Sequence, residues 1–165
     1  MQFSMEPPRL SDSAVSALVN GVINGLITWS AFKASESIPL SMDSIGAAGV
    51  TALGNAATVA FALTLILTCI TFFVFRRSAR KSDIAGQALR NMSFLPTGLR
   101  IALLNTLLVF GAFVAAAVLW QRVAGTVQVG PVTATLVVAA VAAIATAVAE
   151  WRTKREMLAE SAARR

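Results

Sequence analysis

The stretch IGAAGVTALGNAATVAFALTLILTCITFFVF at residues 45–75 contains no charged side chain. Three other stretches, at residues 14–32, 101–120 and 132–149, share this property, so all 14 basic and 8 acidic residues lie outside the four. A helix rises about 1.5 Å per residue, and the hydrocarbon core of a bilayer is about 30 Å thick. Each stretch is long enough to cross it. The sequence therefore predicts an all-α integral membrane protein with the fold of a four-helix bundle.

The length of the chain leaves room for one domain only. It has 165 residues, of which 56% are hydrophobic, and the longest polar connection covers residues 76–100. A connection of this length is well below the roughly 40 residues that an independent core needs without disulfides or metals. We therefore expect a single transmembrane domain over residues 1–165.

The basic residues alternate between the two sides of the predicted bundle. One precedes the first span, and the four later polar segments contain one, six, one and five in turn. The rule that positive charge stays in the cytoplasm then places both termini and the second connection inside. Within that connection, Arg76, Arg77, Arg80 and Lys81 are predicted to contact the headgroups of anionic lipids.

The three tryptophans agree with this topology. Indole prefers the boundary between headgroups and hydrocarbon. Trp29 and Trp120 fall near the predicted outer ends of spans one and three, and Trp151 follows the inner end of span four. We therefore predict all three to be interface anchors.

Small residues indicate where helices approach each other. Gly21 and Gly25 have the four-residue spacing that lets two helix backbones come close, which predicts a helix-packing surface on span one. The alternative is a chance pair in a chain rich in Gly and Ala. Span four consists almost entirely of Ala, Val and Thr, and this composition predicts an interior helix.

The second connection contains a pattern of its own. Ile84, Ala88 with Leu89, and Met92 recur at helical spacing after Ser82, and four basic residues lie just before them. This pattern predicts a short amphipathic helix at 82–94 that lies in the headgroup plane. The alternative is a solvated loop that serves only the topology.

The two halves of the chain hint at a duplication. Each half predicts a helical hairpin with an Asn early in its first span, Asn20 or Asn105, and a Pro in its outer connection, Pro39 or Pro131. Such a pattern fits a repeat related by an axis along the membrane normal. The residue-level similarity between the halves is weak, so unrelated hairpins stay an alternative.

Four amides supply the polar side chains with most chemical interest inside the spans: Asn20, Asn24, Asn55 and Asn105. Counting about 1.5 Å per residue places Asn20 and Asn105 about 10 Å from the inner side and the other two near the midplane. An amide in hydrocarbon needs a partner, so one interpretation is a set of interhelical hydrogen bonds. The other is a hydrated path for a solute.

Several chemistries are absent from the sequence pattern. The chain has no His, its single cysteine is Cys69, and no carboxylate lies inside a span. These facts disfavour His-based catalysis, an intrachain disulfide and transport driven by a buried acid. We expect a non-enzymatic protein with no cofactor and no metal. Because the positive charge follows the predicted membrane sides, it does not indicate nucleic-acid binding.

A family resemblance concerns the first 80 residues. The run NGVINGLITW at 20–29, then SIPLS at 37–41 and a small-residue span ending in the basic pair at 76–77, resembles small bacterial membrane proteins labelled permease. No substrate is attached to that label, and it brings no binding residues. The resemblance implies a location in the bacterial inner membrane and a nominal transport role.

Two functional hypotheses follow. The first is a self-associating permease or channel-like protein whose polar contacts are the four asparagines. The second is an accessory or scaffold subunit that binds another membrane protein through small-residue helix faces. The expected partners are a bilayer with anionic lipids and either further copies of the chain or another membrane protein.

Overall fold

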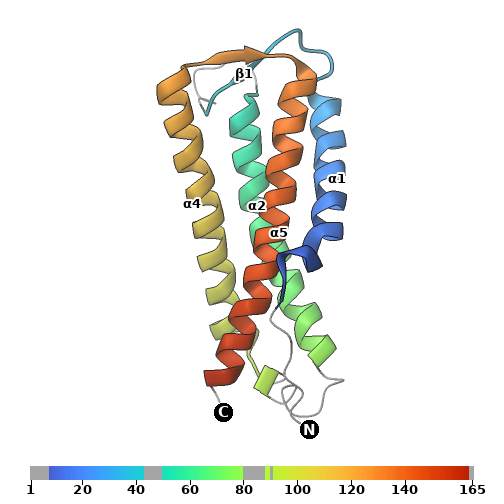
Figure 1. The fold of residues 1–165 in the computed structure, drawn as a ribbon, viewed down its shortest axis with the longest axis vertical. Helices are drawn as coiled ribbons and strands as arrows, with labels where there is room; N and C mark the ends of the chain where they lie inside the picture. The colour runs from blue at the N-terminus through green and yellow to red at the C-terminus, as the bar shows by residue number, and fades with distance from the viewer. Residues whose placement is uncertain (1–7, 43–49, 80–87, 90, 164–165) are drawn as a thin grey trace.

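The computed structural model describes residues 8–42, 50–79, 88–89 and 91–163, and these form an upright bundle of long helices (Figure 1). Within these residues, four helices are long and apolar enough to cross a membrane, which indicates a multi-pass membrane protein. The elements in chain order are the 3₁₀-helix η1 (Leu10–Ser13), α1 (Ala14–Phe32), β1 (Ile38–Leu40), α2 (Ala52–Ala79), the π-helix η2 (Phe94–Gly98), α4 (Leu99–Ala124), β2 (Val127–Val129) and α5 (Pro131–Ala163).

The helix bounds differ from the predicted spans in an informative way. Helix α1 has the predicted bounds. Helix α2 starts at Ala52 rather than at residue 45, although residues 43–49 lie outside the described part. At their polar ends α2 and α5 continue beyond the uncharged stretches, to Ala79 and Ala163. The uncharged stretch marks only the apolar part of each helix, whereas backbone hydrogen bonds continue into the charged residues that follow.

The predicted outer connections contain a short sheet that the all-α prediction did not include. Strands β1 and β2 pair antiparallel with Pro39 opposite Gln128. Gly125 ends α4 with a φ of 69°, a conformation that glycine adopts without strain, and Pro131 starts α5 with its φ preset for a helix. Under the sheet, Ile38 packs with Phe32, Ala52 and Ala134. We call this end of the bundle the sheet end and the opposite end the charged end.

The arrangement of the helices matches a two-fold relation between the halves α1–β1–α2 and α4–β2–α5. Helices α2 and α5 pack on each other in the middle, α1 packs on α5, and α4 packs on α2 (Figure 1). An axis along the bundle would generate this pattern together with the antiparallel strand pair. The prolines do not correspond, because Pro39 lies in β1 whereas Pro131 is the first residue of α5.

The composition of helix α5 predicted an interior helix, and α5 does pack on all three other long helices, but its face with Leu136 and Ile144 is exposed. It contacts α1, α2 and, to a smaller extent, α4. Its small side chains allow this, and Ala134, Val138, Ala142 and Ala149 are fully buried. The small cross-section of Ala lets three helices pack on a fourth.

Residues 82–87 and 90 of the predicted interfacial helix at 82–94 lie outside the described part. Three residues of its apolar pattern are described: Ala88 is partly buried, whereas Leu89 and Met92 are fully buried and pack with Phe72 and Met157 at the charged end. These two side chains therefore contact protein rather than the lipid that the amphipathic pattern predicted. Leu89 and Met92 can reach this contact because α2 and α5 continue beyond their uncharged stretches, to Ala79 and Ala163.

Candidate functional site

The glycine pair of α1 faces α5. A Cβ atom added to Gly21 would lie 3.2 Å from both the carbonyl oxygen of Ala139 and the Cβ of Ala143. A Cβ on Gly25 would lie 3.2 Å from the Cβ of Ala139. Both helices thus contribute small residues four positions apart, and their backbones approach within direct contact. The two glycines therefore pack against α5 of the same chain, and this face of α1 is not available to a partner protein.

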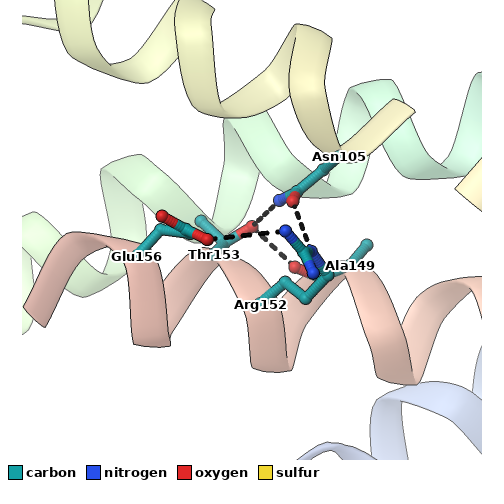
Figure 2. Close-up of polar contacts among 5 residues, drawn as sticks. All are labelled: Asn105, Ala149, Arg152, Thr153 and Glu156. Atoms are coloured by element: carbon teal, nitrogen blue, oxygen red, sulfur yellow. Dashed lines mark hydrogen bonds and ion pairs between the residues drawn. The ribbon is translucent and has the colours of Figure 1, made fainter. Parts of the chain in front are cut away.

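Asn105 of α4 is the centre of a polar network with α5 at the charged end. Its side chain is buried, and its amide nitrogen donates to Thr153 Oγ1 at 3.2 Å. The Thr153 hydroxyl donates in turn to the carbonyl of Ala149 at 2.6 Å. Figure 2 shows Asn105 reaching from α4 toward α5, where Arg152 and Thr153 meet it. This network satisfies the amide on both sides, because Arg152 Nε donates to Asn105 Oδ1 at 3.0 Å.

Two ion pairs extend this network away from the bundle centre, one within α5 and one between α4 and α5. Arg152 reaches Glu156 at 3.4 Å, one turn further along α5. Arg100 of α4 lies 2.8 Å from Glu160, another turn on. The two pairs and Asn105 together form a polar seam between the helices, in which Asn105 is the buried end and Arg100 the exposed end.

The other three asparagines do not join this network. Asn55, in the first turn of α2, donates to Thr28 Oγ1 of α1 at 3.4 Å, near the sheet end. Asn24 donates to the backbone carbonyl of Asn20 on its own helix at 2.9 Å. Asn55 was expected near the midplane, but it lies close to an end because α2 starts seven residues later than the predicted span. The structure therefore spreads the four amides along the bundle.

Buried threonines form a polar core that the sequence pattern alone did not reveal. Three of their hydroxyls donate to a carbonyl four residues earlier on the same helix, and those of Thr68 and Thr106 have no hydrogen-bond partner among the described residues. The fully or nearly buried threonines among the described residues are Thr28, Thr51, Thr64, Thr68, Thr71, Thr97, Thr106, Thr146 and Thr153. The spacing of Thr64, Thr68 and Thr71 on one helix face could have indicated it.

Arg152 is a further residue that the sequence did not identify, because it follows the uncharged stretch and resembles any other basic residue of the tail. Helix α5 runs without a break through this position, so Arg152 continues the face that carries Val141, Ala145 and Val148. The sequence signal for Arg152 was the spacing of four, three and four residues between positions 141, 145, 148 and 152, which places them on one helix face. A basic residue in register with an apolar face places a cation at the end of that face.

This face of α5 lines an open cavity of about 430 Å³ between α4 and α5. The facing residues of α4 include Leu108, Ala112 and Phe113, and Ala60 of α2 also contributes. Among the described lining residues Arg152 alone is charged. The cavity is therefore an apolar groove with one cation at its end nearer the charged end, and we call it the α4–α5 groove.

The outward face of α4 carries a second group of small residues. Gly111, Ala112, Ala115 and Ala116 are exposed in the middle of the helix, and a Cβ added to Gly111 meets no atom within 4 Å. Large exposed side chains lie on both sides of the group along the helix, among them Leu107 and Leu119. The small group therefore forms a depression on the apolar surface of α4.

The predicted interface residues lie near the bundle ends. Trp29 and Trp120 are exposed near the sheet end, in the last turns of α1 and α4. Trp151 lies toward the charged end, where its indole nitrogen donates to the carbonyl of Pro8 at 3.1 Å and Arg155 lies over its ring at 5.3 Å. Of the predicted lipid contacts, Arg76 and Arg77 lie in the last turn of α2, whereas those at 80 and 81 are outside the described residues.

Comparisons with known proteins found no match to this chain among protein-family models, curated proteins or solved structures. The function must therefore be argued from the arrangement of the residues themselves.

Proposed function

We propose that this protein is a non-enzymatic accessory subunit of the membrane, which binds a transmembrane helix of another membrane protein along the outward face of α4. The observation that carries this proposal is the exposed group around Gly111, where an added Cβ would meet no atom within 4 Å. In hydrocarbon, small residues let a second helix approach closely and gain van der Waals contact. The large neighbours Leu107 and Leu119 would pack on both sides of the incoming helix.

The contrast with α1 supports the choice of surface. Gly21 and Gly25 are already occupied by Ala139 and Ala143 of α5. The outward face of α1 instead presents large residues such as Leu18, Val22 and Leu26, which suit contact with lipid chains. Of the two glycine-containing faces, only that of α4 is free for a partner within the described structure.

The permease or channel hypothesis has weaker support. It rests on four asparagines at related depths, and these amides are spread from the sheet end to the charged end. Asn105 is engaged with Thr153 and Arg152, and Asn24 with its own backbone. An arrangement in which Asn24, Asn55 and Asn105 each bond a nearby group favours helix cohesion over a solute path.

We further propose that the charged end faces the cytoplasm of a bacterial inner membrane and the sheet end faces outward. The distribution of basic residues supports this orientation. The test uses single cysteines at the exposed positions Ser37, Gln128 and Ala159 in a Cys69→Ala background. In intact cells, an impermeant thiol reagent should label the first two and leave the third unlabelled. Labelling of Ala159→Cys alone would reverse the orientation.

The accessory role is tested by a photo-crosslinking amino acid at Gly111 in the full-length chain, with Val22 on the outward face of α1 as the matched control. Both positions are exposed on apolar helix faces. The Gly111 probe should give one discrete adduct with a different protein, and the Val22 probe should give none. An adduct of two identical chains would instead favour the self-associating hypothesis. Lipid adducts alone at Gly111 would contradict both.

A further inference from the structure

We infer that the α4–α5 groove is a binding site for one anionic phospholipid, with an acyl chain along the groove and the phosphate on Arg152. This site borders the docking surface proposed on α4 and shares Ala112 with it, but it does not depend on a protein partner there. The groove is open, has a volume of about 430 Å³ and is lined by apolar side chains apart from Arg152. Such a lining suits hydrocarbon, because a polar solute would lose its hydrogen bonds there.

The length of the groove matches one leaflet of a bilayer. Along α5 it extends from Val141 to Arg152, which is about 16 Å of helix. Half of a hydrocarbon core of roughly 30 Å is about 15 Å. Val141 lies ten residues from the start of α5 at Pro131, which is about 15 Å more and places it near the middle of the membrane. An acyl chain that starts at Arg152 would therefore end near Val141.

The position of Arg152 matches the level of lipid headgroups. It follows Trp151, whose indole is expected at the boundary between headgroups and hydrocarbon. The Arg152 guanidinium is held by a hydrogen bond from Nε to Asn105 Oδ1 at 3.0 Å. The two terminal nitrogens do not take part in this bond. A planar guanidinium with terminal N–H groups is well suited to two oxygens of a phosphate.

The acidic residues near Arg152 leave it able to bind an anion. Glu156 is the acidic partner of Arg152, but the contact is 3.4 Å long and the Glu156 side chain is 47% exposed, so it is weak. Glu150 lies 3.6 Å from Lys154, and Glu160 lies 2.8 Å from Arg100. These two acids are thus paired with other cations, and a phosphate can replace Glu156 on Arg152.

The buried network gives the site its fixed geometry. Thr153 bonds to Ala149 and accepts from the Asn105 amide, so the orientation of Asn105 Oδ1 is determined before any ligand binds. A guanidinium positioned in this way loses less side-chain freedom on binding than a solvated arginine would. This pre-organisation distinguishes Arg152 from the diffuse basic charge of the predicted inner surface.

The test is native mass spectrometry of the purified full-length protein with phosphatidylglycerol and phosphatidylcholine that have the same acyl chains. We expect the wild-type chain to retain one phosphatidylglycerol with at least about fivefold preference, the effect of one well-placed cation. Arg152→Gln should abolish the preference. Arg155→Gln is the matched control, because this arginine lies over Trp151 on the same helix and does not line the groove. Equal losses in both variants would overturn the proposal.

A second variant tests the acyl-chain half of the proposal and keeps it testable if Arg152→Gln does not fold. Ala112→Phe adds a large side chain at an exposed position of the groove wall and changes no charge. We expect it to lower retention of phosphatidylglycerol severalfold. Unchanged retention would show that the lipid binds elsewhere. Conversion of a dimer to a monomer by this variant, without loss of lipid, would show that a second copy occupies the groove and would also overturn the proposal.

Discussion

Helix α5 forms two contacts of opposite character, one with α1 and one with α4. Against α1, the helices fit so closely that a Cβ added to Gly21 or Gly25 would lie 3.2 Å from Ala139 or Ala143. Against α4, the side chains of Leu108 and Phe113 border a groove of about 430 Å³. There the helices meet at the charged end, through hydrogen bonds that Asn105 forms with α5.

The difference shows that small side chains on α5 alone do not produce a close contact between helices. Its alanines face both neighbours, but a close contact also needs small residues on the partner. Helix α1 supplies them at the right positions, whereas the glycine of α4 points outward. The α1 contact is therefore stabilised mainly by van der Waals contact, and the α4 contact mainly by the hydrogen bonds of Asn105.

The largest expected effect tests the close contact. Gly21→Leu should lower the free energy of unfolding by about 2 to 3 kcal/mol, because its side chain cannot fit between the backbones of α1 and α5. Gly111→Leu is the control, since its added atoms enter open space, and it should change stability by less than about 0.5 kcal/mol. Unfolding in mixed dodecyl maltoside and SDS micelles, followed by tryptophan fluorescence, measures both. Similar losses in the two variants would contradict the comparison.

The next effect tests the polar contact. Asn105→Leu should cost about 1 to 2 kcal/mol, because it removes a bond across the helices and the acceptor of Arg152 Nε. Asn24→Leu should cost less than about 0.5 kcal/mol, since Asn24 bonds only to the backbone of its own helix among the described contacts. A double-mutant cycle of Asn105→Leu with Arg152→Gln measures the coupling. Additive losses would separate Arg152 from the network.

A smaller effect concerns the side-chain hydrogen bond between α1 and α2. Thr28→Val should cost about 0.6 kcal/mol, the average for hydrogen bonds between membrane helices, because it removes the acceptor of Asn55. Thr58→Val is matched in size, but Thr58 is exposed and donates to Gly54 of its own helix. The same unfolding assay should show little change in this control. A larger loss for Thr58→Val would show that α1 and α2 are not linked through Thr28.

The smallest effect is expected at the exposed end of the polar seam. Arg100→Gln should cost no more than about 0.5 kcal/mol, because the Arg100 side chain is 58% exposed and water screens its pair with Glu160. This loss should shrink further as salt is raised from about 50 to about 500 mM. A loss that exceeds that of Asn105→Leu would show that the ion pair, rather than the buried amide, holds α4 to α5.

The sequence predicted the fold better than the site. The four helices and the bounds of α1 follow from uncharged stretches, and the interior place of α5 follows from its Ala, Val and Thr. The pair β1–β2 was not predicted, because each strand has three residues and is defined by a partner about 90 positions away. Asn105 is a candidate from the sequence, but its partners Arg152 and Thr153 are not, since they lie beyond the uncharged stretch.

The sequence by itself determined which segments form helices long and apolar enough to cross a membrane. This is so because the cost of a charge in hydrocarbon applies residue by residue and can be followed along the chain. Only the tertiary structure decided that Gly21 meets α5 while Gly111 faces outward, and that Arg152 ends an apolar groove. These properties depend on which helix faces meet, and the same small residue is buried or exposed according to the neighbour it receives.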